Sequence, residues 1–115
     1  MPQFMLLLRD DPGVFQSLSP DEIQRIIQKY QAWGESLRSR GLLAHSAKLT
    51  DGAGRVMRRD SGRVRVTDGP YSEAKEVLGG YFTINADSYE QAIQRCHDCP
   101  HLEFGTIEVR EVDVV

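Results

Sequence analysis

The chain has 115 residues, a length that supports one domain with its own hydrophobic core and excludes two. Its formal net charge of −3 gives no support for nucleic-acid binding, which needs clustered positive charge. No apolar run approaches the roughly 20 residues of a membrane-spanning helix, and the N-terminus lacks a signal-peptide pattern. We therefore expect a single domain over residues 1–115, cytoplasmic, with neither a nucleic-acid nor a membrane partner.

The first half of the chain predicts a strand, a long helix and a second strand. Residues 4–8 form an apolar run typical of a strand buried on both faces, and residues 10–13 predict a turn. The segment SPDE at residues 19–22 combines a capping hydroxyl, an early proline and a glutamate three residues after the cap, so a helix begins there. Gly41 ends that helix. Residues 42–49 then predict a strand with Leu43, His45, Ala47 and Leu49 on one face.

The second half predicts a hairpin, a strand, a second helix and a final strand. Two glycine-marked turns bracket residues 55–59 and precede residues 63–67, which is typical of a hairpin whose arginines face solvent. Residues 78–84 predict the next strand. Asp87 and Glu90 form a capping pair at the start of a second helix, and Pro100 ends that helix. The apolar stripe of this helix predicts that it buries Tyr89, Ala92, Ile93 and Cys96. Residues 106–112 predict the last strand.

This order indicates an α+β fold: a ferredoxin-like antiparallel sheet with two helices on one face. The first predicted strand is apolar on both sides, so the second face of the sheet also needs cover. The chain has no further elements to provide it. A homodimer in which the two bare faces meet would supply that cover by two-fold symmetry.

The segment DGP at residues 68–70 supports two interpretations. Asp68, Gly69 and Pro70 together are turn chemistry, and the turn alone explains them. Loops at strand ends also hold functional groups, and a partly buried carboxylate there can act as an acid or base. We therefore hypothesise Asp68 as the acid or base, assisted by His45 or by the hydroxyl of Tyr71.

The hypothesis places a small organic ligand in a cleft between the first helix and the sheet, beside the Asp68 loop. Several candidate residues also have purely structural explanations. Glu73 and Lys75 are typical of a solvated helical turn, and Gly79-Gly80 of a β-bulge. The aromatic rings are typical of core packing. The ligand-binding candidates are Gly69, Pro70, Glu73, Lys75, Gly79, Gly80, Tyr81, Tyr30 and Trp33.

Cys96 and Cys99 have the spacing of a redox pair and, with two nearby histidines, suggest a zinc site. Neither interpretation fits well. The cysteines fall at the end of the second predicted helix, where the dipole disfavours a thiolate, and the candidate ligands His97 and His101 are crowded. The chain also has no glycine-rich phosphate loop. We expect no metal and no cofactor.

A family resemblance rests on the segment TDGPYSEAKE at residues 67–76 and the following Leu78-Gly79-Gly80. It extends through residues 41–43, Ala92, Cys99-Pro100 and residues 107–110. With these residues the chain resembles the DGPF family of YCII-related proteins over nearly its whole length. The resemblance implies a dimeric α+β barrel, which agrees with the fold predicted from periodicity.

The resemblance also implies a bacterial setting and an association with extracytoplasmic-function sigma factors, but no substrate. An accessory or sensor module working with a sigma factor is thus the alternative to an acid/base enzyme. This chain departs from the family at Tyr71, where the motif has phenylalanine, and at Ser72 and Ala74. The wider group is associated with a His-Asp pair around the first helix, and the matching positions here are Tyr30 and Ser39.

Overall fold

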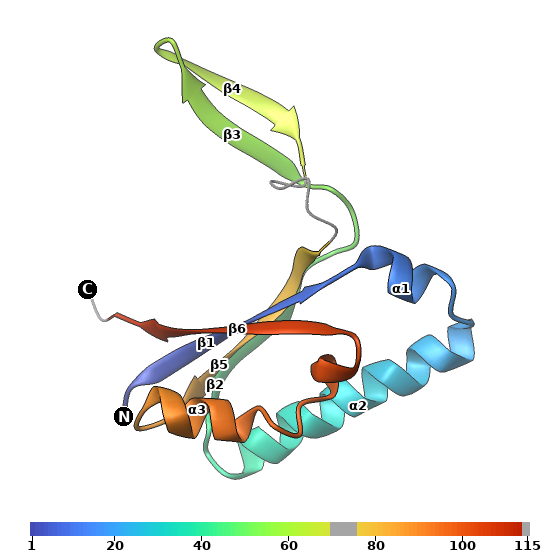
Figure 1. Cartoon of the computed structure of the whole chain (residues 1–115), viewed down its shortest axis with the longest axis vertical. Coiled ribbons are helices and arrows are strands. Elements are labelled where there is room, and N and C mark those ends of the chain that lie inside the picture. The colour runs from blue at the N-terminus through green and yellow to red at the C-terminus, as the bar shows by residue number, and fades with distance from the viewer. Residues whose placement is uncertain (70–75, 114–115) are drawn as a thin grey trace.

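The computed structural model describes residues 1–69 and 76–113 (Figure 1). In chain order its elements are β1 (Gln3–Asp10), α1 (Pro12–Gln16), α2 (Pro20–Ser39), β2 (Leu43–Lys48), β3 (Arg55–Asp60), β4 (Arg63–Asp68), β5 (Val77–Asn85), α3 (Tyr89–Arg95), the short 3-10 helix η1 (Pro100–Glu103) and β6 (Gly105–Val112). Over these residues, no helix combines the length and the apolar character needed to cross a membrane.

Four strands form the main sheet in the order β2-β5-β1-β6, and every neighbouring pair is antiparallel. Read without the β3–β4 hairpin, this is the ferredoxin-like arrangement of two βαβ units. The predicted α+β fold is therefore confirmed. Strand β1 lies in the middle of the sheet, which explains its apolar sequence.

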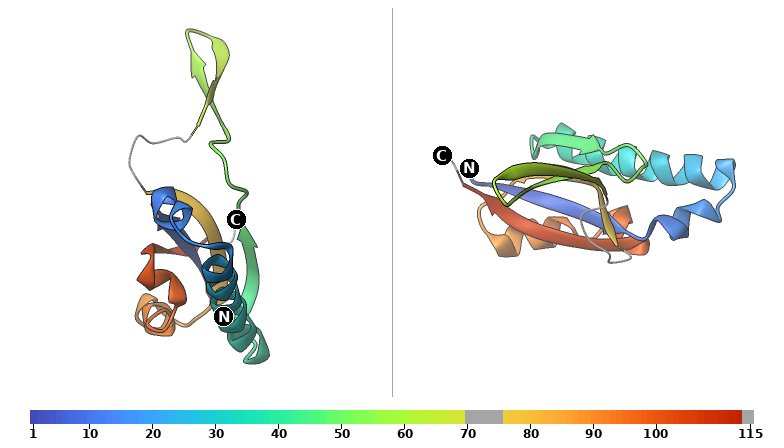
Figure 2. Two further views of the ribbon diagram at one scale, coloured as in Figure 1. Left: turned by 90° about the vertical axis from the view of Figure 1, so that its right-hand side faces the viewer. Right: turned by 90° about the horizontal axis from the view of Figure 1, so that it is seen from above.

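Helices α2 and α3 pack on one face of the main sheet (Figure 2). Strand β1 turns Phe4, Leu6 and Leu8 toward them, because side chains two residues apart share a face. The predicted arrangement of two helices over one face is thus confirmed. The buried core comprises Phe4, Leu6, Leu8, Trp33, Leu37, Phe82, Ile84, Ala86, Ala92, Cys96 and Cys99.

The helix signals in the sequence were correct for α2 and displaced by one residue for α3. The Ser19 hydroxyl accepts from the Glu22 amide at 3.2 Å, and the Ser19 amide donates to the Glu22 carboxylate at 3.4 Å. Helix α3 is capped by Ser88, which accepts from the amide of Gln91 at 3.1 Å, and not by the predicted Asp87–Glu90 pair. The two overlapping patterns both match the capping signature, so the sequence did not separate them.

Two further predictions about local structure were wrong. The stretch over residues 10–13 leads into helix α1 and not only a turn, because Asp11 accepts from the Gly13 amide at 2.9 Å and caps it. Tyr89 and Ile93, both predicted to be buried, are 43% and 47% exposed, whereas Ala92 and Cys96 are buried. Helix α3 has only seven residues and presents a narrow stripe to the core.

Strand β2 contains a bulge that reverses the predicted orientation of His45. Leu43 pairs with Ile84 and packs against the core, but His45 pairs with Thr83, so Ala44 is an extra residue between them. Leu43 and His45 therefore lie on opposite faces of the main sheet, and their predicted common face was wrong. His45 is exposed.

The second face of the main sheet has no described helix against it (Figure 2). We call this the bare face. The register places on it Met5, Leu7, Tyr81, Thr83, His45 and Ala47 from β1, β5 and β2, together with the charged Glu108 and Arg110 from β6. Met5 and Leu7 are half-buried in the protomer. Full burial of β1 on both faces, as predicted, would therefore require another surface to cover the bare face.

Strands β3 and β4 form a two-stranded ribbon that projects from the main body (Figure 1). Its turn is Ser61-Gly62, with φ angles of 51° and 78°, the positive values that a two-residue hairpin turn needs. The predicted hairpin is confirmed. On one face of the ribbon Met57, Val64 and Val66 are 68%, 52% and 56% exposed.

Candidate functional site

His101 is buried, with 1% of its surface exposed, at the end of the main sheet. Its Nδ1 lies 2.7 Å from the hydroxyl oxygen of Tyr30, and its Nε2 lies 2.8 Å from the carbonyl oxygen of Arg9. A carbonyl only accepts, so Nε2 carries a proton; in the neutral ring Nδ1 then accepts from the Tyr30 hydroxyl. Burial raises the pKa of Tyr30, which keeps its hydroxyl protonated. The imidazole thus joins α2 and η1 to β1.

Gly105 makes this close approach possible. A Cβ at this position would lie 2.0 Å from the Arg9 carbonyl oxygen and 2.9 Å from His101 Nε2. Only glycine lets β6 begin so near to both atoms. Gly105, at the start of β6, therefore leaves the space that the His101 ring needs beside the Arg9 carbonyl.

Asp10 follows Arg9 and ends β1, where it pairs with Val77 on one side and Gly105 on the other. Burial raises the pKa of the Asp10 carboxyl, and electrostatic interactions with His101 and Lys48 lower it by less. The neighbouring Asp51 and Glu76 add to the increase. A half-buried carboxyl with a raised pKa is a typical acid/base group.

The predicted pair Gly79-Gly80 allows close approach of the Asp10 side chain and of the neighbouring strand β2. The register shifts where Leu8 pairs with Gly80 and Arg9 with Leu78, so Gly79 is the extra residue of a β-bulge. The bulge interpretation is confirmed. A Cβ on Gly79 would lie 3.1 Å from the Asp10 carboxylate, and one on Gly80 would lie 2.8 Å from the Ala47 carbonyl oxygen.

Glu76 interacts electrostatically with Asp10. Thr106 on β6 is linked to Asp10 only through Glu76, because Thr106 pairs with Arg9 and lies on the opposite face of the main sheet. The Thr106 hydroxyl donates to the Glu76 carboxylate at 3.0 Å. Glu76 directly follows residues 70–75, which lie outside the described residues. We call Asp10, Tyr30, Glu76, His101 and Thr106 the Asp10 cluster. It combines one half-buried carboxyl, a doubly hydrogen-bonded imidazole and further polar side chains.

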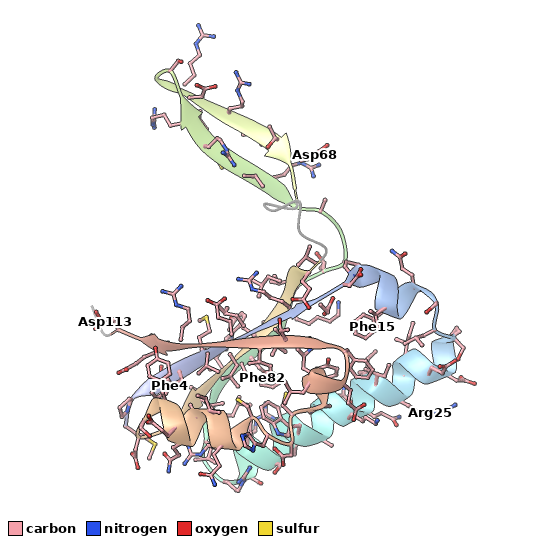
Figure 3. The ribbon with its side chains drawn as sticks, viewed as in Figure 1. Phe4, Phe15, Arg25, Asp68, Phe82 and Asp113 are labelled. Carbon is pink, nitrogen blue, oxygen red and sulfur yellow. The ribbon has the colours of Figure 1, made fainter. Side chains whose placement is uncertain are left out.

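Asp68 lies on the ribbon, away from the main sheet (Figure 3). Its side chain is 83% exposed, and its carboxylate lies 3.4 Å from Arg55. The next residue, Gly69, has a packing role, because its Cβ would lie 2.0 Å from the Ala53 carbonyl oxygen. Its amide donates to the Gly54 carbonyl at 3.1 Å. The acid/base role of Asp68 stays a prediction.

The other predicted site residues are dispersed. His45 and Tyr81 meet on the bare face with ring centroids 5.5 Å apart. Trp33 is 7% exposed and packs edge-on against Phe82 at 5.0 Å, so these rings occupy space between α2 and the main sheet. Tyr30 belongs to the Asp10 cluster. Pro70, Tyr71, Glu73 and Lys75 lie outside the described residues.

Cys96 and Cys99 are both buried and unpaired. Burial raises the pKa of Cys96 to about 12 and that of Cys99 to about 11. A thiol with such a pKa is protonated near neutrality and reacts slowly, which disfavours a redox role. Both ring nitrogens of His101 are hydrogen-bonded within the chain, so it is not free to join these sulfurs around zinc.

Sequence reasoning missed Asp10 and reached His101 only as a zinc candidate. The aspartate stands at a strand end, which is a common place for functional groups. The histidine gave no such signal, because its partners are 71 and 92 residues away in the chain.

The fold and the cluster define a small ferredoxin-like α+β domain with a polar group at one end of its sheet. A family model described as the YCII-related domain matches residues 2–114. The chain therefore belongs to the YCII-related family. It is also 28% identical over 110 residues to "Uncharacterized protein R00369" of Rhizobium meliloti (strain 1021), covering 93% of this chain and 89% of that protein.

The raised pKa of Asp10 predicts a pH-dependent stability. Because the folded pKa lies above the ordinary value of 3.8, folding binds a proton, and stability falls as the pH rises through and above that value. Asp10→Asn should therefore gain stability relative to the native chain at about pH 7 and lose that gain at about pH 3. Urea unfolding across this range measures the difference. The exposed Asp113→Asn is the control, and an equal pH profile for both variants would contradict the burial of Asp10.

Proposed function

We propose that this protein binds a small organic molecule at the Asp10 cluster and exchanges a proton with it through Asp10, without a metal or a nucleotide cofactor. One observation carries the proposal: Asp10 is a half-buried carboxyl with a raised pKa beside a buried histidine that tethers the end of β1. Such a carboxyl takes and returns protons nearer to neutral pH than an exposed aspartate does.

The other members of the cluster have distinct roles in this proposal. His101 and Tyr30 are positioning residues, since both imidazole nitrogens are already engaged. Glu76 and Thr106 offer polar atoms that orient a ligand. Glu76 directly follows residues 70–75 in the sequence, and this adjacency to the motif and its Tyr71 supports a role for that segment beside the ligand.

The proposed assembly is a cytoplasmic, bacterial homodimer formed through the bare face. Met5, Leu7 and Tyr81 present apolar surface there, and the ribbon presents Met57, Val64 and Val66. A two-stranded ribbon is at best marginally stable alone in water. A second copy supplies cover for both surfaces and repeats each contact by symmetry.

A second candidate function is an accessory or sensor module that contacts a sigma factor. The ribbon favours it, because exposed arginines surround an apolar face that points away from the core. Exposed patches of this kind are typical of protein contacts. In this alternative the Asp10 cluster receives a ligand without transforming it.

The small-molecule proposal is tested by a ligand screen with thermal unfolding as the readout. A true ligand should raise the melting temperature of the native chain and of Asp113→Asn, and should lose that effect in Asp10→Asn. Asp68→Asn is measured in parallel because its side chain is exposed on the ribbon. A ligand that fails with Asp68→Asn and still binds Asp10→Asn would place the site at the motif aspartate and contradict this proposal.

Sedimentation at micromolar concentration tests the assembly. The native chain should sediment at twice the protomer mass of 13.0 kDa. Ala47→Glu, on an exposed position of the bare face, should shift it to a monomer because a buried carboxylate lacks a partner. Thr50→Glu, exposed beyond the end of β2, should leave the dimer intact. A native chain that sediments only at 13.0 kDa would refute the homodimer.

A further inference from the structure

A groove lies on the outer surface between α2 and the segment from α3 to η1. It consists of two adjoining hollows of about 420 and 490 Å³, which share His97 and Asp98. No member of the Asp10 cluster lines either hollow. The volumes fall in the range of small-molecule sites. The groove is thus separate from the site proposed above.

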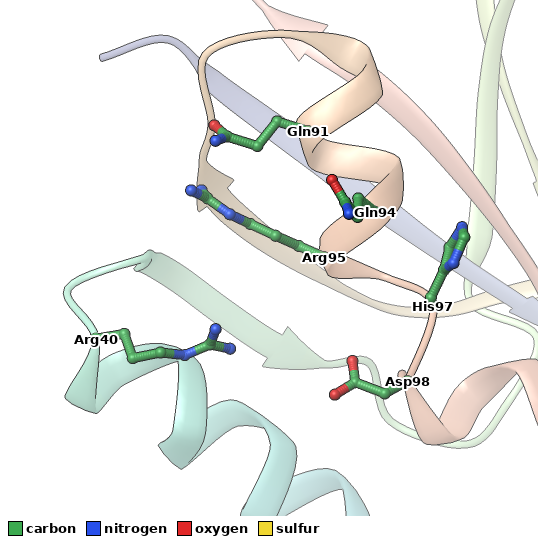
Figure 4. Close-up of a pocket in the computed structure, with 6 residues that line it drawn as sticks. All are labelled: Arg40, Gln91, Gln94, Arg95, His97 and Asp98. Carbon is green, nitrogen blue, oxygen red and sulfur yellow. The ribbon is translucent and has the colours of Figure 1, made fainter.

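One end of the groove is cationic (Figure 4). Arg40 enters from the end of α2 and Arg95 from α3, with Gln91 and Gln94 beside them. Arg40 Nε donates to the Ser36 carbonyl at 3.2 Å, and Arg95 donates to the Asn85 carbonyl. Among the described residues neither guanidinium pairs with a carboxylate, and each group has five N–H donors. Both therefore have donors left for an external anion.

The carboxylate of Asp98 lies in the middle of the groove, where the two hollows meet. Asp98 points into the groove (Figure 4), where its Oδ1 accepts from Trp33 Nε1 at 3.1 Å. This bond holds the carboxylate at the edge of the indole. No ion pair joins Asp98 to Arg40 or Arg95 in the described structure. Asp98 thus divides the groove without neutralising its cationic end.

The other end of the groove is apolar. Its floor consists of Ala32, Trp33, Pro100 and Leu102, of which Leu102 is 51% exposed. Lys29 and Glu103 form an ion pair of 3.4 Å at its margin, so their charges offset each other. An exposed leucine next to an indole gives an apolar ligand a surface on which to pack.

We propose that this groove binds an organic anion with an apolar body. The acidic group lies between Arg40 and Arg95, and the body extends past Asp98 onto Trp33 and Leu102. Charge complementarity selects the acid, because arginine donors match the planar oxygens of a carboxylate and also those of a phosphate. A purely apolar ligand would leave the two arginines without an anion, and a small inorganic ion would leave the apolar end uncovered. Neither is therefore the preferred ligand.

Calorimetric titration with two probes, phenylacetate and phenyl phosphate, tests the proposal. At least one probe should bind at millimolar concentration or better, and the stronger response identifies the acidic group. Arg40→Gln should weaken binding about tenfold, since one charge-assisted hydrogen bond is lost. The matched control is Arg38→Gln, which alters an exposed arginine of the same helix turn that already pairs with Glu35. Added salt should weaken binding as well.

Three further measurements decide between this site and others. Leu102→Ser should weaken both probes but leave inorganic phosphate unaffected, because only the apolar contact is lost. Asp10→Asn should leave binding unchanged, and a loss in that variant would place the probe in the Asp10 cluster and overturn the groove. Equal affinity of Arg40→Gln and the native chain, or no binding of either probe, would also overturn it. Because Arg40 and Leu102 are exposed, neither variant depends on refolding of the core.

Discussion

The end of the main sheet depends on one buried imidazole. His101 donates to the carbonyl of Arg9 and accepts from the hydroxyl of Tyr30, so β1, α2 and η1 meet at a single side chain. An unsatisfied buried polar group costs about 1 to 3 kcal/mol, which makes both bonds necessary to the packing. Asp10, the residue after Arg9, takes its half-buried position from this arrangement. The raised pKa of its carboxyl follows from that position.

Three glycines of the chain are required because backbone atoms approach them closely, and two of these glycines belong to the family motif. Gly69 sits against the Ala53 carbonyl, Gly80 against the Ala47 carbonyl, and Gly105 against the Arg9 carbonyl. In each case a Cβ would overlap a backbone oxygen, so glycine is required by packing alone. Part of the DGP and Gly-Gly signature is thereby explained without a ligand. Asp68 next to Gly69 pairs with Arg55 on the surface of the ribbon.

The fold was predictable from the sequence because its signals are local. The Ser19 and Glu22 capping pair, the alternation in the strands and the Ser61-Gly62 turn each act within a few residues. The Ala44 bulge was not predictable, because it appears only when β2 pairs with β5. The Asp10 cluster was missed for the same reason, since it joins residues from β1, α2, η1 and β6. Tyr30 contributes to the cluster through its hydrogen bond with the imidazole of His101, 71 residues further along the chain.

The central claim is that His101 is held in one tautomer by Tyr30 and the Arg9 carbonyl. Nitrogen-15 NMR of the imidazole at about pH 8 tests this most directly, because the two ring nitrogens have distinct shifts in each tautomer. The account predicts a proton on Nε2 that exchanges slowly with solvent, and a Tyr30→Phe variant in which the Nδ1 shift changes. A proton on Nδ1, or a ring that exchanges rapidly with water, would contradict it.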